Sequence, residues 1–484
     1  MFLKTQIFFI YLFLTLLKNI ISKEKLLFAW QINRHGARAP YKGVENGIDV
    51  FKERWTQIEE LSEVGKRMLY LLGVKNRKRY VDEYKLLSEN YNPQEIYIRS
   101  TDVNRTIESI ESYLQGLYPQ GTGPTLNDKV NTDVNITYPP NIKYQENFKY
   151  IIDHYKLIED KAALPYKMSI EPIHLFFRPR HEFELYNSDI CKGHKEIYEK
   201  QKVRQEVSDL GDELLQKFPW LQILEQTDDN KFLHDYWTIY KYMDGFICDD
   251  TDQRGFSYLK ENFEFNNDTQ NLLRNYSRKY LWMDYSGTNY PAGHDNISIV
   301  ANSYTMHSLI NWMNIAIEKN SKNEFYTKFV IYSAHDSSIG ALEAFMRYAF
   351  DKDMEYSDFA ESRYFELYLD ENTNEPRVRL IRGDTSVKID VTFEEFKKKI
   401  EEKTWSDQKV AEFCQFEDNS KKEEDGGGNN EEKKEEEKGK EEEKGKGKEN
   451  NDNSLALFFL IFLAIINSIL LTILIMLFKK KIRN

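Results

Sequence analysis

Short, mostly apolar runs in this chain each end at a polar turn, and longer segments with helical periodicity separate them. The runs are Leu26–Ile32, Glu95–Ile98 and Phe329–Ala334. The helical patterns span Ile58–Leu72, Val103–Leu117 and Ile339–Phe350. Strands that alternate with helices favour a parallel sheet with helices on its faces. The pattern therefore predicts an α/β protein with a mostly parallel central sheet flanked by helices.

Two other regions depart from this alternation. Tyr364–Leu369 and Arg377–Ile381 flank the polar segment DENTNEP, which predicts an antiparallel hairpin at the sheet edge. The middle of the chain, 131–298, is rich in aromatic and charged residues and mostly helical in pattern, for example over Ser188–Phe218. We expect it to form an inserted α-helical cap lobe.

The first residues are typical of a secretory signal. Lys4 precedes an apolar stretch from Ile7 to Leu17, and Ser22 is a small residue at a suitable cleavage position. Residues 1–22 are therefore predicted to be a signal peptide. An uncleaved N-terminal anchor remains the alternative, because no small-x-small cleavage site is present.

A second apolar stretch, Leu455–Phe478, is long enough to span a membrane. Its 24 residues are apolar except for Asn467, Ser468 and Thr472, and as a helix they would extend about 36 Å. Basic residues favour the cytoplasmic side of a membrane, and three lysines and Arg483 follow at once. The pattern predicts a single-pass type I membrane protein with a lumenal or extracellular catalytic domain, endolysosomal or at the cell surface. A removed lipid-anchor signal is the rival interpretation.

The segment before this span holds 13 acidic residues and 9 lysines between Lys421 and Asn453, without any aliphatic or aromatic residue. Such a segment cannot bury apolar surface and is expected to be a solvated stalk. It contributes −4 of the formal net charge of −12, so that net charge says little about the substrate. The acidic balance and the lack of a basic stripe argue against nucleic-acid binding.

These observations predict seven regions. They are a signal peptide (1–22), a first α/β part (23–130), the mainly helical cap (131–298), a second α/β part (299–418), the stalk (419–453), a transmembrane helix (454–478) and a cytoplasmic tail (479–484).

The chain has three cysteines, which in an exported protein allow at most one disulfide and leave one thiol. No two of them are close in sequence, so metal binding by cysteines is not expected. Sequons that could carry glycans are found at Asn135, Asn267, Asn275 and Asn296, with another at Asn104 inside a motif described next.

Charged and histidine side chains follow all three predicted parallel strands. They are Arg34, His35 and Arg38 after the first, Arg99 after the second, and His335 and Asp336 after the third. The carboxyl ends of parallel strands meet at one edge of a sheet, where ligands collect. Converging guanidinium groups need an anion, and their planar N–H forks match phosphate oxygens. This predicts a phosphate monoester site.

The remaining groups suit phosphoryl transfer without a metal or another cofactor. A neutral imidazole can attack phosphorus and form a covalent intermediate, and a neighbouring carboxyl can protonate the leaving oxygen. Each motif alone also has a structural interpretation: the Arg-His pair as a surface turn, Asp336 as a helix cap and Arg99 as a structural ion pair. Only their occurrence after three apolar strands favours catalysis.

The chain resembles the histidine acid phosphatases, a clan of the histidine phosphatase superfamily, over most of Leu26–Cys414. The matching stretches are RHGARAP at Arg34–Pro40, YIRSTDVNRT at Tyr97–Thr106 and SAHDSS at Ser333–Ser338. The resemblance implies a phosphoglycerate-mutase-like α/β domain with a helical cap and metal-independent hydrolysis at acid pH.

Residue by residue, the resemblance implies these roles. His35 is the nucleophile and Asp336 the proton donor, while Arg34, Arg38, Arg99 and His335 bind the phosphate. Arg105 is interpreted as a structural helix residue.

The resemblance also bears on the cysteines and on the substrate. Cys191 and Cys414 fall near positions that pair in mammalian relatives, which implies a disulfide between them and a free Cys248. The HDSS stretch is not close to the His-Asp-Thr of phytases or the His-Ala-Glu of inositol polyphosphate phosphatases, which disfavours phytase activity. The membrane topology resembles lysosomal acid phosphatase, but the tail lacks a tyrosine sorting signal. Dimers occur in the family, so a homodimer stays open.

Three functions are kept as hypotheses. The first is an acid phosphatase that acts broadly on small phosphomonoesters through a phosphohistidine. The second is a phosphatase specialised for lipid or inositol phosphates, and the third is a catalytically idle surface-binding protein on the same scaffold. The intact set of Arg, His and Asp residues argues against the third.

Overall fold

The computed structural model describes most of 24–126 and 296–415 together with parts of the intervening segment. The described residues are 24–41, 55, 57–126, 161–176, 191–202, 205–217, 236–254, parts of 267–279, 296–352, 357–383 and 386–415. They all belong to one compact unit, Met1–Glu417. The predicted signal peptide, stalk, transmembrane helix and cytoplasmic tail lie outside the described residues. Within the described part, no helix combines the length and apolar character needed to span a membrane.

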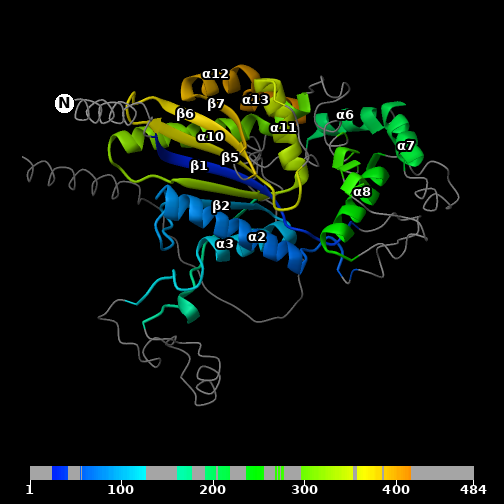
Figure 1. Cartoon of the computed structure of the whole chain (residues 1–484). Coiled ribbons are helices and arrows are strands. Elements are labelled where there is room, and N and C mark those ends of the chain that lie inside the picture. Colours follow the sequence, from blue (N-terminus) through cyan, green and yellow to red (C-terminus); the bar gives the residue numbers. More distant parts are fainter. Residues whose placement is uncertain are drawn as a thin grey trace, which may run out of the picture. The chain divides into compact units, whose positions relative to one another are not determined.

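In the described part of the chain, one sheet of seven strands forms the centre of the fold (Figure 1). Its order is β3-β2-β4-β1-β5-β6-β7. The strands are β1 (Glu24–Arg34), β2 (Ile96–Thr101), β3 (His174–Phe176), β4 (Phe329–Ala334), β5 (Ser362–Asp370), β6 (Pro376–Arg382) and β7 (Ser386–Thr392). The pairs β3/β2, β2/β4 and β4/β1 are parallel, whereas β1/β5, β5/β6 and β6/β7 are antiparallel.

The sheet is therefore mixed, and the prediction of a mostly parallel sheet was wrong for the half that contains β5, β6 and β7. Short connections join these three strands, and short connections permit only antiparallel neighbours. The predicted hairpin is confirmed, with Tyr364 opposite Ile381. The predicted strands before the three polar turns are also confirmed as β1, β2 and β4. One further strand, β3, lies within the range expected for the cap but pairs with β2.

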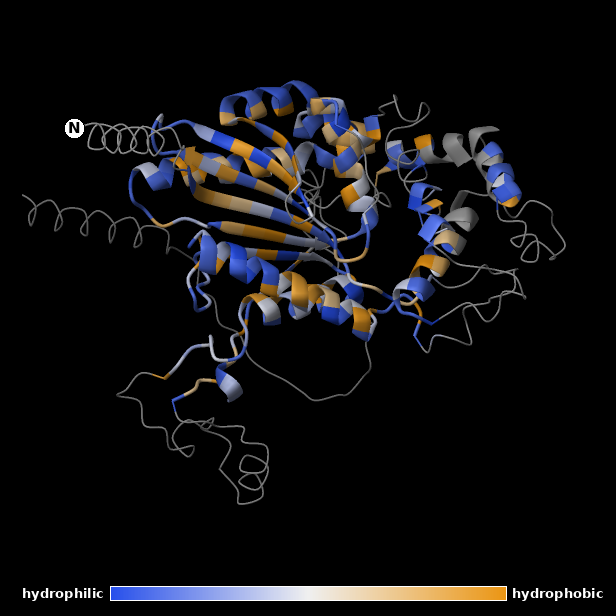
Figure 2. Cartoon of the chain, in the orientation of Figure 1, coloured by the Kyte–Doolittle hydropathy of each residue, from blue (hydrophilic) through white to orange (hydrophobic). Residues whose placement is uncertain are grey.

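Helices cover both faces of the sheet (Figure 1). On one face lie α2 (Glu63–Asn76), the π-helical turn η1 (Arg77–Glu83) and α3 (Asn104–Leu117), whose apolar residues share a cluster with Ile98 and Ile331. On the other face lie α10 (Asn296–Ser321), α11 (Asp336–Phe350) and α12 (Phe393–Lys403), packed against Trp30 and Tyr332. Figure 2 shows the corresponding pattern: hydrophobic residues dominate the central strands, whereas the helices alternate hydrophobic and hydrophilic positions.

The middle of the chain contributes further helices where they are described. They are α6 (Lys192–Lys202), α7 (Gln205–Lys217) and α8 (Tyr236–Thr251), with a short 3-10 turn η2 (Pro165–Lys167) before them and α13 (Asp407–Cys414) near the end of the described chain. The helical pattern predicted for Ser188–Phe218 is confirmed by α6 and α7.

The predicted disulfide is present and joins Cys191, just before α6, to Cys414, the last residue of α13. Cys248 is a buried free thiol, as expected. The two segments approach closely, because a Cβ on Gly193 would lie 2.5 Å from the carbonyl oxygen of Phe413. Among the sequons, Asn267, Asn275 and Asn296 are exposed, whereas Asn135 lies outside the described residues.

A buried carboxylate ties the sheet to the helices on the α2 side. Glu366 on β5 has no exposed surface and accepts hydrogen bonds from Arg79 at 2.7 and 2.6 Å. The hydroxyl of Tyr80 donates to the same carboxylate at 2.7 Å, and that of Tyr368 donates to it as well. A buried charge is tolerated only when it is paired and hydrogen-bonded, so this network fixes η1 against β5.

Replacing Glu366 by Ala should destabilise the fold strongly, because Arg79 would be left half-buried without its carboxylate. The free energy of unfolding should fall by about 3–5 kcal/mol in urea titrations followed by tryptophan fluorescence. Glu375→Ala, at an exposed position of the β5–β6 turn, is the matched control and should change stability by less than about 0.5 kcal/mol. Similar losses for the two variants would contradict a stabilising role of the Glu366 network.

Candidate active site

The parallel pairing of β1 with β4 brings two histidines to one edge of the sheet. Arg34 lies opposite Ala334 in the register, and each strand is followed directly by a histidine. The ring centroids of His35 and His335 are 5.6 Å apart, although the two residues are 300 positions apart in the sequence. Strand β2 pairs with the other side of β4 and ends at the same edge, with Ser100 opposite Ser333.

His35 is held in one tautomer. Its Nδ1 lies 2.8 Å from the carbonyl oxygen of Gly36, and a carbonyl can only accept a hydrogen bond. Nδ1 therefore carries the proton of the neutral ring, and Nε2 keeps its lone pair. Burial, together with the positive charges of Arg38, Arg34 and Arg105, holds the pKa of His35 well below its usual range. The ring is thus a neutral imidazole with a nucleophilic Nε2.

The turn after His35 requires glycine. A Cβ on Gly36 would lie 2.4 Å from the carbonyl oxygen of Gly65, in the first turn of α2. This close contact packs the start of α2 directly against the histidine turn. The backbone N–H of Gly36 also donates to the hydroxyl of Ser109 on α3 at 3.1 Å.

Arg34, the last residue of β1, is completely buried beside the end of β4. One terminal nitrogen donates to the carbonyl oxygen of Ser357 at 2.7 Å, and the other lies 2.9 Å from Oδ2 of Asp336. Its guanidinium group also packs over the ring of Phe359, 4.1 Å from the centroid. These contacts fix the plane of the guanidinium group.

Arg38 is held by an aspartate that the sequence did not indicate. Its two terminal nitrogens donate to both oxygens of Asp244 on α8, at 2.8 and 2.9 Å. Asp244 also lies 3.8 Å from Arg34, and its own exposure is 3 %. The signal available in the sequence was a lone carboxylate in the apolar stretch Met243–Cys248, which is weak because α8 is 206 residues away from Arg38.

The third arginine near the histidines is Arg105, in the first turn of α3. It is 8 % exposed, and its charge contributes to the lowered pKa of both His35 and His335. Arg99, which the sequence pointed to, lies on β2, opposite Tyr332 of β4 and His174 of β3. The clue in the sequence was that Arg105 lies only four residues after the end of β2, in the first turn of the helix that follows.

His335 and Asp336 lie where β4 passes into α11. His335 is the N-terminal capping residue of the helix, and its Nε2 lies 3.0 Å from the hydroxyl of Thr101, which in turn contacts Thr106 at 2.7 Å. These contacts fix the orientation of the His335 ring. They leave its tautomer open, because a hydroxyl can either donate or accept a hydrogen bond. Burial and the charge of Arg105 lower the pKa of His335 to about 3.

Asp336 is the first residue of α11 and is 4 % exposed. Its Oδ1 accepts the backbone N–H of Ser337 at 2.8 Å, while Oδ2 faces Arg34. A carboxylate at a helix N-terminus is favoured by the helix dipole. Asp336 is thus paired with the arginine that precedes His35, and it directly follows His335, whose ring lies 5.6 Å from that of His35.

Together these groups form a site for a tetrahedral anion. Arg34, Arg38 and Arg105 supply positive charge, His35 supplies a nucleophilic nitrogen, and His335 and Asp336 supply proton-transfer or hydrogen-bonding groups. In the ranges that the structure describes, no group of three or more His, Cys, Asp or Glu side chains is arranged to hold a metal ion. The geometry fits nucleophilic attack on a phosphoryl group bound between the arginines.

Comparison with known proteins agrees with this arrangement. Residues 25–382 match the model of the histidine phosphatase superfamily (branch 2). The chain is 40% identical to lysosomal acid phosphatase of Xenopus laevis over 123 residues, which cover 25% of this chain and 26% of the relative. It is 39% identical to human prostatic acid phosphatase over 114 residues, covering 23% and 28%.

These alignments span only about a quarter to a third of the curated relatives. Among solved structures, the phytase of Citrobacter braakii shares the fold, with a TM-score of 0.53 and 12% identity over 79% of this chain and 98% of that chain. The match of the family model across most of the chain decides the classification. The protein belongs to branch 2 of the histidine phosphatase superfamily.

Proposed function

We propose that this protein hydrolyses phosphate monoesters at acid pH through a covalent phosphohistidine on His35. The observation that carries the proposal is the fixed tautomer of His35. Its Nδ1–H donates a hydrogen bond to the Gly36 carbonyl. Nε2 is therefore unprotonated, in a buried site with three guanidinium groups nearby. Such a nitrogen is a ready nucleophile towards phosphorus.

In the first step, Nε2 of His35 attacks phosphorus while the bond from phosphorus to the alcohol oxygen breaks. The charge on the equatorial phosphate oxygens is stabilised by Arg34, Arg38 and Arg105. Asp336 gives its proton to the departing alcohol oxygen. In the second step, water attacks the phosphohistidine, its proton passes to the Asp336 carboxylate, and His35 and inorganic phosphate are released.

Arg34 pairs with Asp336 in the free protein and would pair with the phosphate once substrate binds. This change of partner explains how Asp336 could serve as an acid. Asp336 lies 2.9 Å from Arg34, an arrangement that favours the carboxylate. A bound phosphate dianion would compete for the same guanidinium group and favour a protonated carboxyl beside it. The neutral state of His335 supports a role in hydrogen bonding to the phosphate rather than in charge neutralisation.

The substrate class is proposed from the family and the site together. Relatives named as lysosomal and prostatic acid phosphatases support small phosphomonoesters. The relation to phytases and to lysophosphatidic acid phosphatase type 6 keeps inositol and lipid phosphates as the second candidate class. The cluster of intact charged residues argues against an idle binding protein.

The location is a separate proposal that rests on the sequence pattern. We propose a single-pass type I membrane protein whose catalytic region is lumenal or extracellular, because a basic cluster directly follows the apolar stretch Leu455–Phe478. A homodimer remains a proposal from the family alone.

The third phosphate-binding arginine is proposed to be Arg105 rather than Arg99. Arg105→Ala should lower kcat/KM for p-nitrophenyl phosphate by about 30- to 1,000-fold, the equivalent of about 2–4 kcal/mol, because a charge-assisted contact in a buried site is lost. Inhibition by phosphate and vanadate should weaken in parallel. Arg99→Ala is the matched control, and a larger loss for it than for Arg105→Ala would restore Arg99 to the site.

Replacing His35 and replacing Asp336 should lower activity in different ways, because only the loss caused by replacing Asp336 should depend on the leaving group. His35→Ala should abolish turnover of every ester, whereas Asp336→Asn should impair alkyl phosphates far more than p-nitrophenyl phosphate, whose leaving group needs no proton. Rapid acid-free quenching with labelled substrate should trap phosphate on His35 in a form stable to alkali. Equal losses on both esters, or label on a serine such as Ser337, would contradict the scheme.

The buried histidines should make stability depend on pH in a defined direction. His335 has a folded pKa of about 3, below its unfolded value of 6.5, so the unfolded chain binds a proton that the folded chain does not. The stabilisation is complete above pH 6.5 and is lost as pH falls towards 3. Between pH 6.5 and 5 the loss should be about 1.5 kcal/mol from His335.

Urea titrations in phosphate-free buffer measure this effect. His335→Gln should retain only the contribution of His35 and the other titrating groups, so its stability should fall less steeply with acidification than that of the wild type. Parallel curves for the two proteins would show that His335 is not held neutral by burial.

A further inference from the structure

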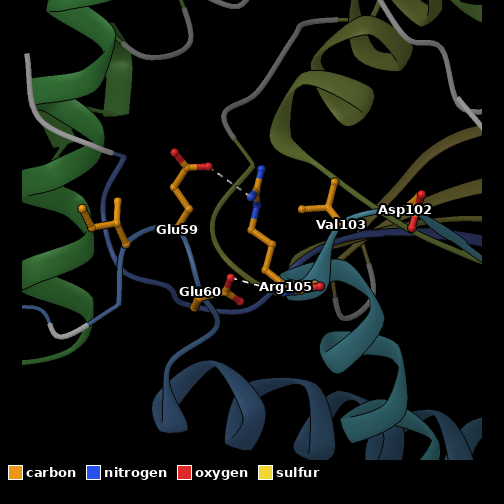
Figure 3. A pocket seen from close by; sticks show the side chains of 7 residues that line it. Glu59, Glu60, Asp102, Val103 and Arg105 are labelled. Atoms are coloured by element: carbon orange, nitrogen blue, oxygen red, sulfur yellow. Dashed lines mark hydrogen bonds and ion pairs between the residues drawn. The ribbon is translucent and has the colours of Figure 1, made fainter. Parts of the chain in front are cut away.

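A cavity of about 510 Å³ lies beside Arg105, and apart from Arg105 its lining residues have no part in the proposed catalytic scheme. One wall comes from the segment before α2, with Glu59 and Glu60, and the other from the β2–α3 turn, with Asp102 and Val103. Figure 3 shows Glu59 and Arg105 reaching towards one another across it. Cavities of this size suit small organic ligands.

The first wall is fixed to the histidine motif through its backbone. Arg38 and Leu61 form an antiparallel bridge, the N–H of Ala39 donates to the carbonyl of Glu60 at 2.9 Å, and that of Glu59 donates to Pro40 at 3.2 Å. The carboxylates of this wall are therefore held by the same residues that carry the nucleophile.

The second wall also adjoins the reacting centre. Asp102 directly follows Thr101, whose hydroxyl contacts His335, and Arg105 acts on the pKa of both histidines. A phosphate bound against Arg105 and the histidines would therefore lie beside this cavity, which is open to its alcohol portion.

Arg105 is the polar group that points to a ligand here. Its side chain is 10% exposed, and its Nε donates no hydrogen bond within the described part of the chain. Its ion pair with Glu59 is long, at 3.7 Å. A buried guanidinium group with an N–H that makes no hydrogen bond is suited to bind an incoming anion.

The rest of the lining has the opposite charge. Glu59, Glu60 and Asp102 contribute three carboxylates to a lining that contains one guanidinium group, and Glu59 is the carboxylate that pairs with it. Glu60 accepts a hydrogen bond from Asn104 at 3.3 Å, and Ile58 and Val103 add apolar surface. Once a phosphate occupies Arg105, these carboxylates would repel further anionic groups and attract a cation.

We propose that this cavity binds the alcohol portion of the substrate and selects phosphate monoesters whose alcohol carries an ammonium group over those that carry additional phosphates. The proposal rests on the proposed phosphatase function and narrows its substrate class. Glu59 and Glu60 face the ammonium group, Ile58 and Val103 contact its carbon atoms, and Arg105 stays with the phosphate. Inositol polyphosphates are poor substrates because each extra phosphate meets a carboxylate.

A pair of substrates that differ only in charge tests the selection. Phosphocholine and 3,3-dimethylbutyl phosphate have the same shape, and only the first is cationic. In the wild type, kcat/KM should favour phosphocholine by about tenfold at low salt, and the preference should shrink as salt screens exposed charges. In Glu59→Gln/Glu60→Gln the ratio should fall towards one. Because the readout is a ratio within each variant, a general loss of activity cancels.

Matched controls separate this effect from a change in net charge. Glu111→Gln, at an exposed position of α3, removes a carboxylate from the same helix region but should keep the wild-type ratio. Inositol hexakisphosphate should be hydrolysed far less efficiently than p-nitrophenyl phosphate by the wild type and should improve in the double variant. A wild-type ratio near one, or the same ratio in the double variant, would overturn the proposal.

A binding measurement tests the selection independently of turnover. The non-hydrolysable phosphonates with the same cationic and neutral tails can be titrated into the full-length protein by calorimetry. Tighter binding of the cationic phosphonate, lost in Glu59→Gln/Glu60→Gln, supports the selection even if no ester is hydrolysed. Absent hydrolysis of p-nitrophenyl phosphate would contradict the phosphatase function, whereas equal Kd values for the two phosphonates would contradict the cation selection.

Discussion

Two buried arginine–aspartate pairs are the interactions on which the site depends. Arg34 pairs with Asp336 and Arg38 with Asp244, and the four side chains are between 0 and 6% exposed. A guanidinium group removed from water is strongly unfavourable unless a carboxylate and further hydrogen bonds compensate it. The pairs join the end of β1 to α11 and to α8, so the positive site exists only when the sheet and the middle segment are folded together.

The same positive charges determine the state of the histidines. With burial and three arginines around them, His35 and His335 have lowered pKa values and stay neutral in acid solution. A protonated imidazole could not act as a nucleophile. The site therefore keeps a usable nucleophile at a pH where an ordinary histidine, with a pKa near 6.5, would be mostly protonated.

The parts of this fold that follow from local pattern could be predicted, and those set by long-range pairing could not. Strands β1, β2 and β4 are apolar runs that end at polar turns. The positions of His35 and His335 could be predicted because each directly follows one of these strands. The antiparallel half depends on β1 pairing with β5, a choice that hydrophobic periodicity does not encode. Asp244 reaches Arg38 across 206 residues, and placing Arg105 near the histidines required knowing where α3 begins.

The charge balance of the site links substrate binding to proton uptake. Among the groups buried at the site, three arginines (Arg34, Arg38 and Arg105) against two aspartates (Asp244 and Asp336) leave one net positive charge around two neutral imidazoles. Glu59 pairs with Arg105 at 3.7 Å but is 41% exposed, so its charge is screened by solvent. A phosphate dianion would turn that balance negative, and in a buried site the excess is most readily removed by a proton. Asp336 pairs with Arg34 and directly follows His335, whose ring lies 5.6 Å from that of His35, so we infer that it receives the proton. The acid that catalysis needs would then form when the phosphate binds, and low pH would favour both events.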